Sequence, residues 1–133
     1  MKRYLPDTNA VGDFHRFGVP RRVRETRARG VIIGTCEPVV AELFFGAENS
    51  DTREENLRRL KQGLLRLRCW PLDRRASEEF GRLASTLKRA GRVVGPMDML
   101  IAAIALTLGD CAVVSTDADM LAIPGLTVEN WRT

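Results

Sequence analysis

Short apolar runs alternate with longer segments of mixed polarity along the whole chain. The first run, Tyr4 and Leu5, stops at Pro6, which cannot donate to a sheet ladder. Residues 31–34 (VIIG) are continuous and β-branched, which is typical of a buried parallel strand. Together these patterns predict five strands, near residues 2–6, 31–34, 69–72, 112–115 and 126–131.

Between these runs the spacing of apolar positions indicates helices. Residues 10–17 are typical of a short helix or loop, and 20–30 form a polar surface helix closed by Gly30. We expect Thr35 to cap a helix over 35–48 that has Pro38 in its first turn. Further helices are predicted over 54–67, 73–91 and 96–108, the last of them apolar on nearly every side.

The order of these elements is β-α-β-α-α-β-α-α-β-α-β with short connections. This order predicts an α/β fold, a three-layer α/β/α sandwich around a central, mainly parallel sheet. A chain of 133 residues can bury a sizeable core, and no repeats or linkers divide it. We therefore expect one domain over residues 1–133.

The residue types exclude several kinds of active site. The chain has a single histidine, His15, whereas a zinc hydrolase needs several His or Cys ligands and a Ser or Cys nucleophile needs a His base with an orienting partner. Cys36, Cys69 and Cys111 are far apart and lie beside apolar residues, so reduced packing thiols are favoured over a disulfide or a zinc site. Any catalysis must then come from carboxylates.

Positive charge is carried mostly by arginine. Lysine and arginine total 21 residues, of which three are lysines, and the net charge is +4. Arginine matches phosphate oxygens bidentately, so a phosphate-rich partner is one interpretation and a solvated basic surface is the other. The segment 21–29 concentrates this charge.

No run reaches the roughly 20 apolar residues of a membrane span, and we expect a cytoplasmic protein.

Two carboxylates stand out in the first third of the chain. Asp7 follows the first strand, where chemistry collects in open α/β sheets, although an Asp there can also simply cap a helix or start a turn. Glu42 shares its helix face with apolar and small residues and has no Lys or Arg one turn away. It either pairs with a distant arginine or belongs to a site.

Two more positions follow in the last third. Asp98 lies in the first turn of the apolar helix. A favourable interaction with the helix macrodipole could by itself explain an aspartate at this position. Asp117 comes two residues after a strand, with Asp119 just beyond, and a turn or helix cap is the alternative.

Two carboxylates about 4 Å apart would repel each other by roughly 4 kcal/mol at an effective dielectric of 20. A bound cation makes such a cluster tolerable, and oxygen ligands favour Mg²⁺ or Mn²⁺. This arrangement suits metal-assisted hydrolysis of phosphodiesters.

Five motifs in order resemble the PIN-domain nucleases, and within them the VapC toxins of type II toxin-antitoxin systems. They are LPDTNA, VVAELFFGAE, GPMDMLIAAIAL, VVSTDADM and IPGLTVENW. The resemblance implies that four carboxylates bind metal and catalyse: Asp7, Glu42, Asp98 and Asp117. It implies that Asp119 can assist or replace Asp117, and that Asn9 or Thr116 holds the site by hydrogen bonds.

The resemblance also implies an activity and partners. One or two Mg²⁺ or Mn²⁺ ions would bind the scissile phosphate, while Asp98 or Asp117 orients a water and the products carry 5′-phosphates. The substrate would be RNA, such as tRNA or ribosomal RNA, and the partners a cognate antitoxin and a second copy of the chain. Four arginines are the first candidates to contact RNA: Arg21, Arg22, Arg24 and Arg27.

Other readings remain open at this point. A catalytically idle PIN domain that binds RNA or assembles with partners is one, and a nuclease of RNA processing outside toxin-antitoxin biology is another. Haloacid dehalogenase phosphatases need an Asp two residues after the nucleophile, where this chain has Asn9. Receiver domains need adjacent acidic residues near the start and a later strand-end lysine, which this chain lacks.

Overall fold

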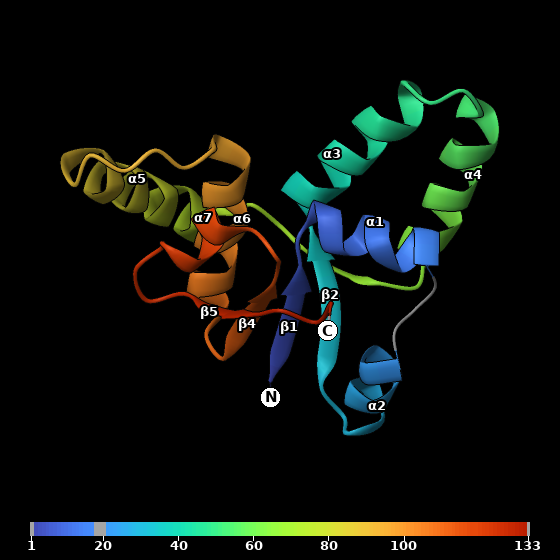
Figure 1. Cartoon of the computed structure of the whole chain (residues 1–133), viewed down its shortest axis with the longest axis horizontal. Coiled ribbons are helices and arrows are strands. Elements are labelled where there is room, and N and C mark those ends of the chain that lie inside the picture. Colours follow the sequence, from blue (N-terminus) through green and yellow to red (C-terminus); the bar gives the residue numbers. More distant parts are fainter. Residues whose placement is uncertain (1, 18–20, 133) are drawn as a thin grey trace.

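A sheet of five parallel strands forms the centre of the computed structural model, which describes residues 2–17 and 21–132, with the backbone alone at 14–17 and 22 (Figure 1). The strand order is β3-β2-β1-β4-β5, so the first strand lies in the middle. Every pairing is parallel, which confirms the predicted sheet. The strands are β1 Arg3–Pro6, β2 Ile32–Cys36, β3 Arg68–Trp70, β4 Cys111–Val114 and β5 Thr127–Glu129.

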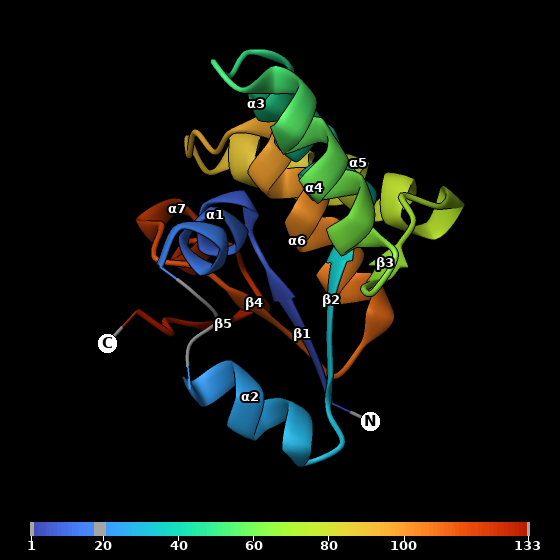
Figure 2. The same cartoon turned by 90° about the vertical axis from the view of Figure 1, so that its right-hand side faces the viewer.

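Seven helices in the described part of the chain surround this sheet. Figure 2 shows α1 and α2 on one side of the sheet and α5 and α6 on the other, which confirms the three-layer architecture. The antiparallel helices α3 and α4 extend beyond the carboxyl ends of the strands (Figure 1). The helices are α1 Thr8–Phe17, α2 Arg21–Ala28, α3 Glu37–Glu48, α4 Arg53–Leu64, α5 Arg74–Arg89, α6 Pro96–Leu108 and α7 Ala118–Leu121.

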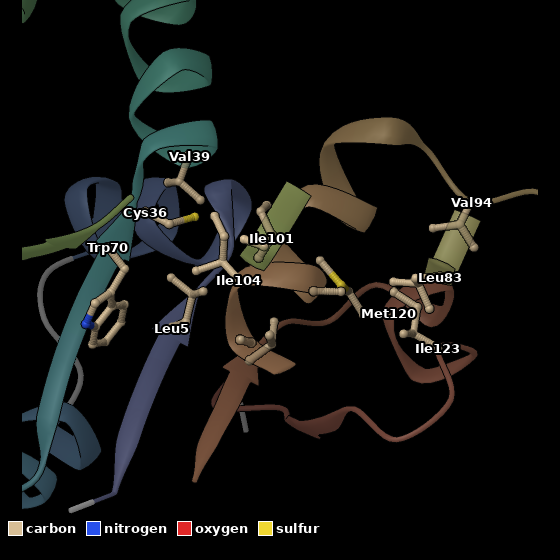
Figure 3. Packing of buried hydrophobic residues seen from close by; sticks show 14 of the residues in the cluster. Leu5, Cys36, Val39, Trp70, Leu83, Val94, Ile101, Ile104, Met120 and Ile123 are labelled. Carbon is tan, nitrogen blue, oxygen red and sulfur yellow. The ribbon is translucent and has the colours of Figure 1, made fainter. Parts of the chain in front are cut away.

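Apolar side chains pack on both faces of the sheet because alternate strand residues point to opposite sides. On one face Leu5 packs with helices α3, α5 and α6, and Figure 3 shows Leu5, Cys36, Val39 and Ile104 gathered there. On the other face a smaller cluster joins Val23 of α2 to β-strand residues and Trp131. Residues 101–105 of α6 are all buried, as the apolar pattern of this helix predicts.

The register of β1 and β4 determines where the site forms. Pro6 pairs with Val114, and the backbone N–H of Asp7 donates to the carbonyl of Val114 at 3.0 Å. The residues that follow these two strands therefore leave the sheet at the same edge. At the opposite end of the strand, the Arg3 guanidinium donates to the carbonyl of Leu108, the last residue of α6, and to that of Gly109, the C-cap of this helix.

Several element boundaries differ from the prediction. Strand β2 continues to Cys36, so Thr35 is a buried strand residue and not the cap of α3. Helix α4 ends at Leu64, and Leu65 is 87% exposed where the amphipathic pattern predicts continued helix. Helix α1 begins at Thr8, directly after β1. Helix α5 spans Arg74–Arg89, close to the predicted 73–91. Its start agrees because the Asp73 side chain caps it by accepting the N–H of Ala76 at 2.9 Å.

The cysteines and helices agree with the expectations from composition. The three cysteines are free thiols, and Cys36 is fully buried. Among the helices the structure describes, none has the length and apolar character needed to cross a membrane.

Candidate active site

Five carboxylates come together at the carboxyl edge of the sheet. Asp7 follows β1, Glu42 lies on α3, Asp98 lies in the first turn of α6, and Asp117 and Asp119 lie at the start of α7. Carboxylate oxygens of Asp98, Asp117 and Asp119 lie within 4.8 Å of one another. The charges of Asp7 and Glu42 also act on Asp98, so the predicted set converges in one place.

Asp7 is the most deeply buried of the five, with 5% of its surface exposed. Burial raises the pKa of its carboxyl, and the charges of Asp117 and Glu42 raise it further. Two hydrogen bonds act in the opposite direction: the Ser115 hydroxyl donates to Oδ2 at 2.5 Å, and the Ala10 N–H donates to Oδ1 at 2.8 Å. The second bond also caps α1, so one side chain ends the strand and starts the helix.

Glu42 has a partner in the structure that the sequence did not reveal. The Thr8 hydroxyl donates to its Oε1 at 2.5 Å, and no arginine pairs with Glu42 among the described residues. Since Thr8 directly follows Asp7, the contact joins the start of α1 to the second turn of α3.

Asp98 carries the clearest electrostatic signature of the site. Burial, as the largest cause, and the charges of the neighbouring carboxylates together raise the pKa of its carboxyl to about 6; these neighbours are Asp117, Asp7, Glu42 and Asp119. A carboxylate that is disfavoured both by desolvation and by like charges is typical of a functional site.

Asp117 and Asp119 are joined through the turn that starts α7. Oδ1 of Asp117 accepts the N–H of Asp119 at 2.9 Å, which is the helix cap that the sequence offered as an alternative. The N–H of Asp117 donates to the Ser115 hydroxyl at 3.0 Å. Asp117 is half-buried and Asp119 exposed, and both contribute an oxygen to the close group. Capping and cation binding are compatible, since a carboxylate has about four lone-pair sites.

The donor set fits a hard divalent cation. Ligand oxygens on opposite sides of Mg²⁺ are about 4.2 Å apart, close to the 4.8 Å within which the Asp98, Asp117 and Asp119 oxygens lie. Two ionised carboxylates 4.8 Å apart repel by about 3.5 kcal/mol at an effective dielectric of 20. The cluster is thus chemically suited to hold a divalent cation, which would relieve this repulsion.

The predicted RNA-contacting arginines lie on another part of the surface. Figures 1 and 2 place α2 toward the end of the sheet where β2 begins, away from the carboxyl edge. Arg21 pairs with Glu25 at 2.7 Å, and Arg24 and Arg27 are exposed with no ion pair among the described residues. The side chain of Arg22 lies outside the described part. Beside α2 a cavity of about 610 Å³ is lined by residues that include Arg21, Arg29, Tyr4 and Trp131.

The hydrogen bonds expected of Asn9 or Thr116 come instead from their neighbours in sequence. Asn9 and Thr116 are exposed, and neither donates to a carboxylate among the described residues. Thr8 and Ser115 make these bonds because the Thr8 side chain faces α3 and that of Ser115 faces the end of β1. Their closeness to Asp7 and Asp117 in sequence makes them candidates, but it does not distinguish them from Asn9 and Thr116.

Comparisons with known proteins agree with this geometry. The sequence profile of the PIN domain matches residues 4–126. The chain is 34% identical to the tRNA(fMet)-specific endonuclease VapC of Salmonella typhimurium, covering 98% of this chain and 99% of the relative. It is 30% identical to ribonuclease VapC2 of Rickettsia felis over 80% of each chain.

Solved structures give the same result for the fold. A chain of DNA-bound VapBC from Salmonella typhimurium superposes with a TM-score of 0.87 at 28% identity, covering 98% of this chain and 99% of that one. A chain of VapBC2 from Rickettsia felis, bound to a promoter DNA fragment, gives 0.85 at 28% identity and covers 97% and 98%. With a matching profile over nearly the whole length and relatives that align end to end, the chain belongs to the PIN domain family and, within it, to the VapC ribonucleases.

Proposed function

We propose that this endoribonuclease hydrolyses RNA at the carboxylate cluster with Mg²⁺ or Mn²⁺, as the toxin of a toxin-antitoxin pair. The observation that supports the proposal best is the convergence of five carboxylates, two of which, Asp7 and Asp98, have raised pKa values. Such a cluster is unfavourable without a cation and is well suited to binding one.

In this proposal Asp7, Glu42, Asp98 and Asp117 hold the cation, and Asp119 assists from the exposed side. A bound divalent cation polarises the scissile phosphate and makes a nearby water more acidic. Asp98 or Asp117 orients that water for attack in line with the leaving 3′ oxygen. Cleavage then leaves a 5′-phosphate and does not need the 2′-hydroxyl of RNA.

The basic surface of α2 is proposed to contact the RNA backbone away from the cut. Arg24 and Arg27 are exposed, and Arg21 lines the neighbouring cavity, while Arg22 stays a candidate from the sequence alone. Each arginine that meets a phosphate releases counterions and makes binding depend on salt. In this proposal one structured RNA contacts both this surface and the carboxylate cluster. We propose tRNA first, because relatives from Salmonella typhimurium and Shigella flexneri are named tRNA(fMet)-specific endonucleases.

We also propose a cognate antitoxin as partner. The support is that the similar solved structures from Salmonella typhimurium and Rickettsia felis are VapBC complexes. Assembly as a homodimer and a place in the cytoplasm, where RNA substrates occur, belong to the same proposal.

The test is cleavage of end-labelled total tRNA, initiator tRNA and ribosomal RNA by the purified chain. Reactions contain Mg²⁺, Mn²⁺ or EDTA, and Asp7→Asn is compared with Asp51→Asn, a change at an exposed aspartate between α3 and α4. We expect metal-dependent fragments with 5′-phosphates from the wild type and Asp51→Asn, and none from Asp7→Asn. Intact RNA in every lane, together with no detectable Mn²⁺ binding by the wild type, would overturn the proposal and favour an idle RNA-binding module.

A further inference from the structure

Two hydroxyl groups connect the carboxylates of the cluster to one another. Each lies on a different segment from the carboxylate to which it donates: Thr8 on α1 donates to Glu42 on α3, and Ser115 after β4 donates to Asp7 after β1. Both bonds are 2.5 Å long, at the short end for a hydroxyl and a charged acceptor.

The orientation of the Ser115 hydroxyl follows from its two partners. The backbone N–H of Asp117 can only donate, so Oγ of Ser115 accepts there at 3.0 Å, and its single proton goes to Asp7. Ser115 is 3% exposed, so water does not compete for these bonds. Its own N–H donates to the carbonyl of Glu129 at 3.0 Å, which fixes the backbone at this point.

Thr8 fixes a longer side chain. Glutamate has three rotatable bonds and loses considerable rotamer freedom when it is held in one place. The hydrogen bond occupies Oε1, and no described residue donates to Oε2 of Glu42, which can therefore bind a cation. Since Thr8 follows Asp7, whose Oδ1 caps α1, the position of its hydroxyl is set by the same helix start.

We propose that Thr8 and Ser115 are positioning residues that hold Glu42, Asp7 and Asp117 ready for a divalent cation. The bonds form a continuous series from Asp117 through Ser115 and Asp7 to Thr8 and Glu42, in which Thr8 follows Asp7 along the backbone. This inference rests on the proposed function. Because the ligand side chains are already ordered in the folded protein, the loss of their rotamer entropy does not have to be met when the cation binds. Groups that orient metal ligands in this way typically contribute about 10- to 100-fold to metal affinity or activity.

The test measures Mn²⁺ binding to the RNA-free protein, by the electron paramagnetic resonance signal of free Mn²⁺, beside kcat and KM for RNA cleavage. Thr8→Val removes the hydroxyl and keeps the shape, while Thr8→Ser keeps the hydroxyl. Ser115→Ala is compared with Ser50→Ala, which deletes a hydroxyl that donates to the carbonyl of Ala47 outside the cluster. We expect Mn²⁺ dissociation constants about 10- to 100-fold higher for Thr8→Val and Ser115→Ala, and near wild type for Thr8→Ser and Ser50→Ala.

Other results would count against the inference. Equal Mn²⁺ affinity of Thr8→Val and the wild type overturns it while leaving the proposed function intact. A loss in Thr8→Ser as large as that in Thr8→Val also overturns it, because packing would then be the cause. Absence of Mn²⁺ binding in the wild type refutes the proposed function itself. If Ser115→Ala does not fold, the two Thr8 variants alone decide.

Discussion

Replacing Asp98 by asparagine removes a charge that the metal-free fold tolerates poorly. Burial and four neighbouring carboxylates raise the pKa of Asp98 from 3.8 to about 6. A shift of two pKa units corresponds to about 3 kcal/mol, and half of this remains after discounting for solvent screening at a half-buried site. We therefore expect Asp98→Asn to raise the free energy of unfolding at pH 7.5, in EDTA, by about 1.5 kcal/mol.

The effect has a defined pH dependence. Because the folded state binds the Asp98 proton more tightly than the unfolded state, this carboxyl contributes stability below about pH 4, and that stability is lost as pH rises through about 6. The advantage of the Asp98→Asn variant is thus largest above pH 6 and nearly absent at pH 4. Thermal unfolding should show a Tm increase of about 6 °C at pH 7.5, at about 4 °C per kcal/mol for a chain of this size.

A matched control separates local electrostatics from a general effect of lowering negative charge. Asp51→Asn makes the same chemical change at an exposed site and should leave Tm within about 2 °C of the wild type. Under the proposed function, saturating Mg²⁺ should raise the Tm of the wild type more than that of Asp98→Asn, because the variant lacks one of the proposed ligands in the folded state. A neutral or destabilising effect of Asp98→Asn at both pH values would refute the reasoning.

Three further changes test other parts of the structure. Thr35→Val should raise stability by about 1 kcal/mol in urea unfolding, since the buried Thr35 hydroxyl has no hydrogen-bond partner in the described part of the chain; a loss of stability would indicate a partner for it. Arg24→Ala with Arg27→Ala should weaken RNA binding and reduce its salt dependence by about one phosphate contact per residue, measured by filter binding at several salt concentrations. Asp117→Asn should weaken Mn²⁺ binding more than Asp119→Asn, because Asp117 is half-buried and Asp119 exposed; the reverse order in a titration would make Asp119 the ligand.

Much of the fold could be predicted because local signals coincide with tertiary structure. Asp73 before α5 and the Gly95-Pro96 start of α6 are capping signals that remain valid in the folded protein. Thr35 shows the limit: a threonine before a proline-containing helix is typical of a cap, yet burial in the sheet prevails, and the strand continues through Thr35 to Cys36. Leu65 likewise continues an apolar pattern without finding a surface to pack on.

The convergence of the carboxylates was predictable from the sequence, and the hydroxyl groups that contact them were not. Asp7 and Asp117 follow strands, and parallel strands bring their carboxyl ends to the same edge whatever their order. Which neighbour of each aspartate faces inward depends on side-chain direction after the strand ends, and the sequence does not carry this information. The choice between Thr8 and Asn9, or between Ser115 and Thr116, therefore needed the structure.

The place of β1 in the middle of the sheet has a consequence for synthesis. Asp7 and Ser115 are separated by 108 positions in sequence, and β1 is completed on one side by β4, which is translated long after β1. A chain that emerges from the ribosome amino-terminus first cannot close this side of its sheet until β4 has been made. Under the proposed function, a truncated chain that lacks residues 111–119 has lost two of the proposed metal ligands, Asp117 and Asp119, so we expect it not to cut RNA.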